Sequence, residues 1–271
     1  MLKILHADLR LTTVVSFSLL SSALYAQNFS GSVSVYAFAG GNGGTKAVAI
    51  PKGKTSAQTS LSAAAPAVDA YGTGSVQPGL VKAHSDGESR PLSNQSPYGQ
   101  SFTTSEMYDS IRLTGSNPLK VNVRQLNIGS WFVGGGTNQT DSGFSAGWSL
   151  SGLGVSVNQS YQAWSGNNTN GGLSDVSVTL QPGVWYQLRL WSQTSGDSQD
   201  NSPPYIATRH AEDSSLTVWL ESANNTGFAG LAGPLWISAS GHAYTQAVPE
   251  PGSIAALAVG VIALVGRHRR Q

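Results

Sequence analysis

The sequence predicts an all-β protein: a single antiparallel β-sandwich of jelly-roll type, flanked by an N-terminal signal helix and a C-terminal membrane helix. Three observations support this fold class. Apolar and polar residues alternate in short runs that are separated by Gly, Pro, Asn and Ser, as in half-buried strands. Between the two ends, no long stretch has the 3.6-residue period of a helix. With 271 residues, 39% of them hydrophobic, the chain is long and apolar enough for one large β domain.

The first predicted strand covers residues 33–38, where Val33, Val35 and Ala37 share one face. The same spacing predicts further strands at 119–123, 153–157, 176–180, 184–190 and 216–220, with a Gln-Pro-Gly turn at 181–183. Residues 40–100 are rich in Gly, Thr, Ser and Ala, and we expect short strands at 67–71 and 79–84 around a Gly-rich turn. This region is therefore interpreted as part of the same domain rather than as a linker.

The strand that begins at residue 119 contains a change of parity. Val121 and Val123 lie on one face, whereas Leu126 and Ile128 fall on the other if the strand continues without interruption. An extra residue inserted into the ladder would return both apolar sets to the core. We therefore expect a β-bulge near Gln125.

Composition excludes several kinds of chemistry. The chain has no cysteine, which rules out disulfides, cysteine-ligated zinc, iron–sulfur clusters and a thiol nucleophile. Only 11% of its residues are charged, and residues 27–247 carry ten basic and twelve acidic side chains, a net charge of −2. Clustered Lys and Arg of the kind that bind nucleic acid are missing from this sequence, so no nucleic-acid partner is expected.

The N-terminal residues 1–26 have the pattern of a secretory signal peptide. Lys3 and Arg10 form a weakly basic start, and an apolar stretch follows at 11–20. Small residues precede Ala26, so cleavage is predicted between Ala26 and Gln27. The apolar stretch is too short and too often interrupted by Ser and Thr for a permanent membrane anchor.

The C-terminal residues 248–271 have three parts. An extended motif, Val248, Pro249, Glu250 and Pro251, precedes an apolar run at 254–265 and a basic cluster of Arg267, Arg269 and Arg270. The prolines prevent helix formation in the motif, and the arginines favour the cytoplasmic side of a membrane. A helix over residues 251–266 would span about 24 Å, less than the roughly 30 Å of a hydrocarbon core. A span this short suits a transient sorting signal better than an ordinary tail anchor.

This ending resembles the PEP-CTERM sorting domain of Gram-negative bacterial surface proteins, a tail that is also labelled an ice-binding protein C-terminal domain. The resemblance implies processing by an exosortase, a membrane-embedded enzyme associated with exopolysaccharide production. It implies that Pro249, Glu250 and Pro251 are the recognition residues and that the arginine cluster retains the tail in the inner membrane before processing. Residues 211–216 and 238–244 resemble such proteins more loosely and imply a shared sandwich.

From this resemblance we expect an exported protein that is anchored transiently in the inner membrane and then reaches the cell surface or the extracellular matrix. Its expected role is structural or adhesive, in association with exopolysaccharide or biofilm. We expect no cofactor and no metal. The ligand, the oligomeric state and any calcium binding are left open by the sequence.

Tryptophans suggest an alternative function, glycan binding. If Tyr186, Leu188 and Leu190 face the core, then Trp185, Arg189 and Trp191 face outward, and Trp219 does so on its own strand. Exposed rings beside polar groups can stack on sugar rings while the polar groups bond their hydroxyls. The competing interpretation is that a loop or the second sheet covers these rings.

A second alternative is a secreted hydrolase, although the sequence predicts a protein that is not an enzyme. Residues 143–147 match G-x-S-x-G around Ser145, but the strand and helix that flank a nucleophile elbow are not expected there. Asp213 and His242 would have to complete the triad, or a carboxylate pair would have to meet His210 or His242 in space.

Three weaker patterns are best explained as chance matches to known motifs. Residues 52–55, Lys-Gly-Lys-Thr, lack the first glycine of a P-loop. Asp197, Asp200 and Asn201 offer oxygens to Ca²⁺ without the spacing of an EF-hand. His84, His210 and His242 have no short metal-ligand spacing.

Overall fold

The computed structural model describes residues 29–90, 98–134, 142–164, 172–198, 207–222 and 236–245. Within these ranges the regular secondary structure is β-strand, and none of the described segments is a helix able to cross a membrane. The predicted signal peptide at 1–26 and the sorting tail at 248–271 lie outside the described residues.

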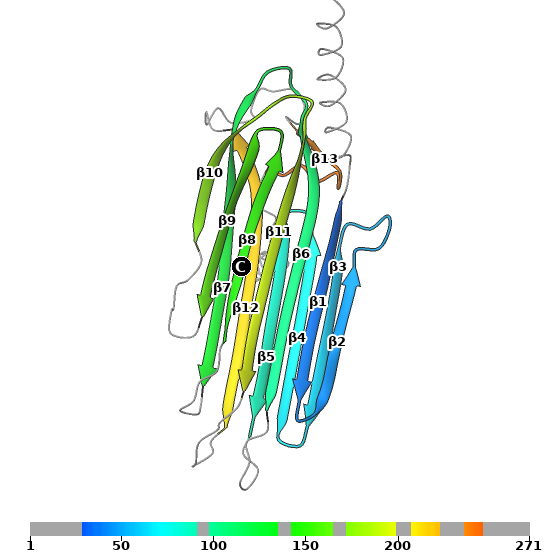
Figure 1. Cartoon of the computed structure of the whole chain (residues 1–271), viewed down its shortest axis with the longest axis vertical. Helices are drawn as coiled ribbons and strands as arrows, with labels where there is room; N and C mark the ends of the chain where they lie inside the picture. The colour runs from blue at the N-terminus through cyan, green and yellow to red at the C-terminus, as the bar shows by residue number, and fades with distance from the viewer. Residues whose placement is uncertain are drawn as a thin grey trace, which may run out of the picture.

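Two antiparallel sheets pack face to face, as shown in Figure 1. The seven-stranded sheet has the order β2 (Asn42–Ala49), β1 (Ser30–Ala39), β6 (Gly99–Leu113), β11 (Trp185–Ser198), β8 (Gly143–Gly152) and β9 (Val155–Trp164), with β13 (Trp236–Ser238) also paired to β6. The six-stranded sheet has the order β10 (Leu173–Leu180), β7 (Leu119–Gly134), β12 (Thr208–Ser222), β5 (Leu80–Ser89), β4 (Val68–Gln77) and β3 (Ala57–Ala65). This arrangement confirms the predicted all-β sandwich.

One half of the interior is apolar because the predicted alternation holds along β1, β11 and residues 216–220 of β12. Val33, Val35 and Ala37 of β1 are fully buried, as the sequence predicts. The inward residues of β11 and β12 do the same: Tyr186, Leu188, Leu190, Leu216, Val218 and Leu220 are all buried. These side chains interlock between the sheets and contribute most of the hydrophobic stabilisation.

The other half of the interior is polar, a feature that the sequence analysis did not anticipate. Hydroxyl groups of the seven-stranded sheet donate to backbone carbonyls of β5 in the facing sheet. Ser105 Oγ lies 2.5 Å from the Lys82 carbonyl oxygen, Thr103 Oγ1 2.8 Å from that of His84, and Ser101 Oγ 3.2 Å from that of Asp86. Small residues allow this approach: a Cβ at Gly74 would lie 2.6 Å from Val33 Cγ1. Much of the Ser and Gly content therefore serves close sheet packing.

The bulge predicted near Gln125 is wrong. The ladder between β7 and β12 runs without interruption from Val121, opposite Ser222, to Gly134, opposite Arg209. Gln125 therefore faces inward with 6% of its surface exposed, and Ile128 faces outward with 53% exposed. Because the interior is partly polar, it accommodates the Gln125 amide. No bulge is therefore needed to turn Leu126 and Ile128 toward the core.

The region 40–100 contains more strand than predicted. The segments 67–71 and 79–84 lie largely within β4 and β5, which continue to Gln77 and Ser89. Two further strands were not predicted. β2 forms a hairpin with β1, and β3 is an edge strand beside β4.

The end of the described chain is tied to β6 by a buried carboxylate. Asp109 accepts hydrogen bonds from the backbone N–H of Ser240 (3.1 Å), from the Ser240 hydroxyl and from the Tyr244 hydroxyl (2.8 Å). The Tyr244 carbonyl in turn accepts from the Leu220 N–H of β12 at 2.8 Å. This closing segment, residues 239–245, therefore contacts both sheets, through Asp109 of β6 and Leu220 of β12.

Candidate functional site

The outer face of the seven-stranded sheet carries a polar cavity beside a tryptophan. We call it the Trp191 surface; it has a volume of about 320 Å³ and is lined by Trp191, Arg189, Ser149, Asn158, Gln159 and Ser160. Its side chains come from three adjacent strands, β11, β8 and β9. The hydroxyl of Ser149 and the amide of Asn158 lie on directly opposite residues of β8 and β9.

Trp191 lies against the sheet because the residue opposite it is glycine. Gly147 of β8 is the cross-strand partner of Trp191, and a Cβ there would lie 2.4 Å from the indole Cζ2. No side chain larger than hydrogen fits beneath the ring in this position. The indole thus remains partly exposed while its other side is supported by backbone.

Arg189 is held in place on both sides by aromatic rings. Its guanidinium carbon lies 5.0 Å from the Trp191 ring centroid and 5.7 Å from that of Tyr108. Arg189 Nε donates to Glu106 Oε1 at 2.5 Å, and the Tyr108 hydroxyl donates to the same oxygen at 2.7 Å. Burial and the bond to Glu106 raise the pKa of Tyr108. The Arg–Glu pair leaves this part of the face without net charge.

The other two predicted glycan-binding tryptophans are covered, which corrects the expectation that they are exposed. Trp185 is 8% exposed and Trp219 is 9% exposed, although both face outward. Each ring has an arginine over it: the Arg112 guanidinium lies 4.9 Å from the Trp185 ring, and that of Arg124 lies 5.8 Å from the Trp219 ring. A cation over an aromatic face is an attractive arrangement, and Arg189 lies over Trp191 in the same way. Exposure separates the three rings, because Trp191 is partly exposed whereas Trp185 and Trp219 are buried.

Further aromatic residues extend from the Trp191 surface across β6 and β1, and sequence reasoning missed them. Tyr36 and Phe102 are direct cross-strand partners, and the rings of Phe38 and Tyr98 are 6.2 Å apart. All four are partly exposed. The signal was available, because residues 36 and 38 occupy the parity opposite to the buried Val33, Val35 and Ala37.

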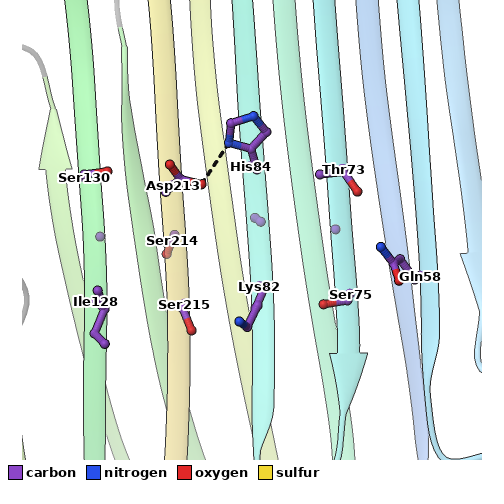
Figure 2. Close-up of a pocket in the computed structure, with 13 residues that line it drawn as sticks. Gln58, Thr73, Ser75, Lys82, His84, Ile128, Ser130, Asp213, Ser214 and Ser215 are labelled. Carbon is purple, nitrogen blue, oxygen red and sulfur yellow. Dashed lines mark hydrogen bonds and ion pairs between the residues drawn. The ribbon is translucent and has the colours of Figure 1, made fainter. Parts of the chain in front are cut away.

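A second, larger cavity lies on the outer face of the six-stranded sheet, shown in Figure 2. We call it the His84 groove; it has a volume of about 380 Å³ and crosses β3, β4, β5, β12 and β7. Its lining side chains include Gln58, Thr73, Ser75, Lys82, His84, Ile128, Ser130, Asp213 and Ser215. Most of these groups are neutral hydrogen-bonding groups, with the charged ones at the centre.

The centre of the His84 groove is an imidazole–carboxylate pair. His84 Nδ1 lies 2.8 Å from Asp213 Oδ1 because the two residues are direct partners on β5 and β12. The hydrogen bond to Asp213 raises the pKa of His84, and partial burial opposes this shift without cancelling it. The Tyr71 ring lies 5.9 Å from the imidazole at the border of the groove.

The structure does not bring the candidate catalytic residues together. Ser145 is the third residue of β8 and lies on the outer face, within the strand instead of on the turn that an elbow requires. His210 is fully buried between the sheets, where its Nδ1 lies 3.0 Å from Glu212 Oε2. Asp213 is paired with His84, whereas the His242 ring packs on Tyr244 in the closing segment, 4.5 Å between centroids.

A buried polar cluster surrounds His210 in the polar half of the interior. The Ser142 hydroxyl donates to Glu212, which also bonds His210, and all three residues are fully buried. Burial raises the pKa of Glu212 more than these bonds lower it. The serine contacts the carboxylate and not the imidazole, so the cluster lacks the serine–histidine contact of an activated nucleophile.

Metal and phosphate patterns have no structural counterpart in the described ranges. No three His, Asp or Glu side chains gather there in a way that would hold a metal ion. Asp197 belongs to β11, while Asp200 and Asn201 lie outside the described residues. Residues 52–55 form an exposed connection between β2 and β3, with no helix to receive a phosphate.

Fold and surfaces together define an antiparallel β-sandwich with an aromatic, polar cavity on one outer face and a charged groove on the other. Residues 247–270 match the PEP-CTERM protein-sorting motif, which confirms the resemblance of the tail. The motif implies export, membrane-anchored transit and processing by an exosortase. Its residues Val248, Pro249, Glu250 and Pro251 and the cluster Arg267, Arg269 and Arg270 lie outside the described residues, as does the predicted cleavage site after Ala26.

Similarity to other proteins is remote. No curated protein matches the sequence of this chain. The solved carbohydrate-binding module TmCBM61, in complex with β-1,4-galactotriose, covers 56% of this chain and 88% of its own at 8% identity and a TM-score of 0.19. The enzymatically active domain of tailspike protein 4 of bacteriophage CBA120 covers 59% of this chain and 19% of its own at 8% identity and a TM-score of 0.17. At these TM-scores neither likeness bears on the ligand of this chain.

Proposed function

We propose that this exported protein binds a neutral extracellular polysaccharide at the Trp191 surface and serves a structural or adhesive role in the matrix around the cell. The observation that carries the proposal is the partly exposed Trp191 ring, which packs against Gly147 at the side of a cavity of about 320 Å³. A sugar ring can stack its apolar face on such an indole with little loss of side-chain entropy, because the ring is already held.

The polar groups around the ring match a sugar better than an apolar ligand. Ser149, Asn158 and Ser160 supply hydroxyl and amide groups that donate to and accept from vicinal hydroxyls. Arg189 adds N–H donors beside the ring, while Glu106 neutralises its charge. A neutral polysaccharide is therefore favoured over an acidic one at this face.

Binding without catalysis is the form of the proposal that the geometry supports. The candidate catalytic residues lie in different parts of the fold. Ser145 is on an outer face, His210 is buried between the sheets, and His242 belongs to the closing segment. The sorting motif would deliver the domain to the compartment where exopolysaccharide accumulates, which supports a role in the matrix or in biofilm.

The test is the substitution Trp191→Ala, studied in the full chain in mild detergent by affinity electrophoresis against a panel of neutral polysaccharides. We expect the wild-type chain to be retarded by at least one polymer and the variant to lose affinity by about tenfold or more, which corresponds to about 1.4 kcal/mol. Phe132→Ala is the matched control, because Phe132 is 55% exposed on the other sheet. Equal retardation of wild type and Trp191→Ala would contradict the proposal.

A further inference from the structure

We propose that the His84 groove is a second binding site, specific for a carboxylate-bearing sugar unit of an acidic polysaccharide. The groove lies on the outer face of the six-stranded sheet, opposite the Trp191 surface. The existence of this site is independent of the function proposed for Trp191. Only the bridging of two polymers, described below, rests on it.

Charge is the first argument. Lys82 and His84 lie two residues apart on β5, so both side chains point to the same outer face. One carboxylate, Asp213, lines the groove with them, and its hydrogen bond to His84 Nδ1 favours the protonated, cationic imidazole. With His84 protonated, two cations and one anion line the groove, and this positive balance is complementary to the carboxylate of a hexuronate unit.

The neighbouring charges do not cancel this excess. Asp86, the next outward acidic residue on β5, pairs with Arg209 of β12 at 3.4 Å. Glu212 is fully buried on the inner side of the sheet, where Ser142 and His210 bond it. The charge of the groove is therefore set by the side chains that line it, Lys82, His84 and Asp213.

Hydroxyl groups are the second argument. Ser75, Ser130 and Ser215 line the groove from three different strands, and the amide of Gln58 closes one side. Figure 2 shows these polar side chains on both sides of Lys82 and His84. Ile128, 53% exposed, supplies an apolar patch for the face of a sugar ring. Such a spread of neutral donors and acceptors fits a polyol and exceeds what a simple inorganic anion would need.

The same residues favour binding over hydrolysis. Glycoside hydrolysis requires two carboxyl groups on either side of the scissile bond. Among the residues that line the His84 groove, Asp213 is the only carboxylic acid, and its Oδ1 is engaged by His84. The groove therefore lacks the pair of carboxyl groups that a glycoside hydrolase uses.

Two sites on opposite faces have a consequence for the whole protein. Packed sheets lie about 10 Å apart, so ligands on the two outer faces cannot collide through the sandwich. One molecule would bind a neutral polymer at the Trp191 surface and an acidic polymer at the His84 groove at the same time. The protein would thus bridge two kinds of polysaccharide chain.

The direct test uses oligogalacturonate as the probe and the full chain in mild detergent. We expect the double variant Lys82→Met with His84→Gln to bind oligogalacturonate at least tenfold more weakly than wild type, measured by calorimetry. Lys120→Met is the matched control, because Lys120 is an exposed lysine of the same sheet outside the groove. Its affinity should equal that of the wild type. A circular-dichroism melting curve verifies folding, and Lys82→Met alone replaces the double variant if that variant unfolds.

The outcomes separate the two proposals. Unchanged affinity for oligogalacturonate in the groove variant, or no binding by the wild type, would overturn the second site and leave the Trp191 proposal intact. If Trp191→Ala keeps its neutral-polymer affinity while the groove variant loses oligogalacturonate, the proposed function fails and the second site stands. Beads coated with the neutral polymer should retain labelled polygalacturonate through the wild-type chain and through neither variant. Failure of the wild type to do so would refute bridging.

Discussion

At the scale of single residues, Gly147 is important because it has no side chain. Its position in β8 beneath Trp191 allows the indole to lie on the sheet, and a methyl group there would overlap both Cζ2 of the ring and the Gln159 carbonyl oxygen, at 2.4 and 2.5 Å. The backbone oxygen cannot move without breaking the β8–β9 ladder. The ring must therefore tilt away if the glycine is replaced.

Gly147→Ala should weaken neutral-polysaccharide binding without removing any group that contacts the ligand. We expect a loss of affinity of several-fold by affinity electrophoresis, together with a destabilisation of about 1–3 kcal/mol from overpacking. Gly44→Ala is a suitable control, since a Cβ at Gly44 meets no atom within 4 Å. Normal binding by folded Gly147→Ala would show that the orientation of the Trp191 ring is unimportant.

At the scale of elements, β7 shows how polar residues enter the interior without a bulge. Asn127 faces inward with 1% of its surface exposed, and its side-chain amide has no hydrogen-bond partner among the described residues. A buried amide without partners costs more than an apolar side chain of similar size. β7 thus keeps an unbroken ladder with β12, although the buried Asn127 amide lowers the stability of the fold.

Asn127→Val should therefore stabilise the protein. We expect the free energy of unfolding to rise by about 1–3 kcal/mol, because the substitution removes the unpaired amide and adds a residue that favours strands. Urea unfolding followed by fluorescence measures this change. Asn122→Val, on the outer face of the same strand, should change stability little, and a destabilised Asn127→Val would mean that the amide has a stabilising role.

The elements also show what the sequence could predict and what it could not. Val33, Val35 and Ala37 alternate strictly, so both the strand and its buried face follow from period two. The inward residues of β12 change from Leu216 to Glu212 within a single strand, and no local pattern distinguishes a polar interior from a solvent face. The parity rule failed at Gln125 for the same reason.

The candidate sites were predictable only in part. Outward alternation placed Trp191 and Arg189 on one face, but the arginines that cover Trp185 and Trp219 come from strands distant in sequence. The His84–Asp213 pair joins residues 129 positions apart, and only the pairing of β5 with β12 brings them into contact.

At the scale of the whole molecule, Asp109 links the closing segment to the fold in a pH-dependent way. Burial raises the pKa of Asp109, and its hydrogen bonds to Ser240 and Tyr244 offset this only in part. The folded state therefore binds this proton more tightly than the unfolded state does. The contribution of Asp109 is fully present below its unfolded pKa and is lost as pH rises through the raised value.

Asp109→Asn should remove this part of the pH dependence, because the amide stays neutral and can still bond both hydroxyls. We expect wild-type stability to fall relative to the variant as the pH rises above about 4, the ordinary pKa of an aspartate, measured by urea unfolding at increasing pH. Asp175→Asn, an exposed residue of β10, controls for the change of net charge. Parallel curves for wild type and Asp109→Asn would show that Asp109 has the same pKa in both states.

The buried Tyr244 also limits the length of chain between the folded sandwich and the sorting motif. Its ring and its carbonyl are held inside the fold, and the sorting motif begins only four residues later, at Val248. Four residues reach at most about 14 Å when fully stretched. While the tail anchors the chain in a membrane, the folded sandwich must therefore stay within a short distance of the lipid surface, and an exosortase acting on the motif would have to work beside it.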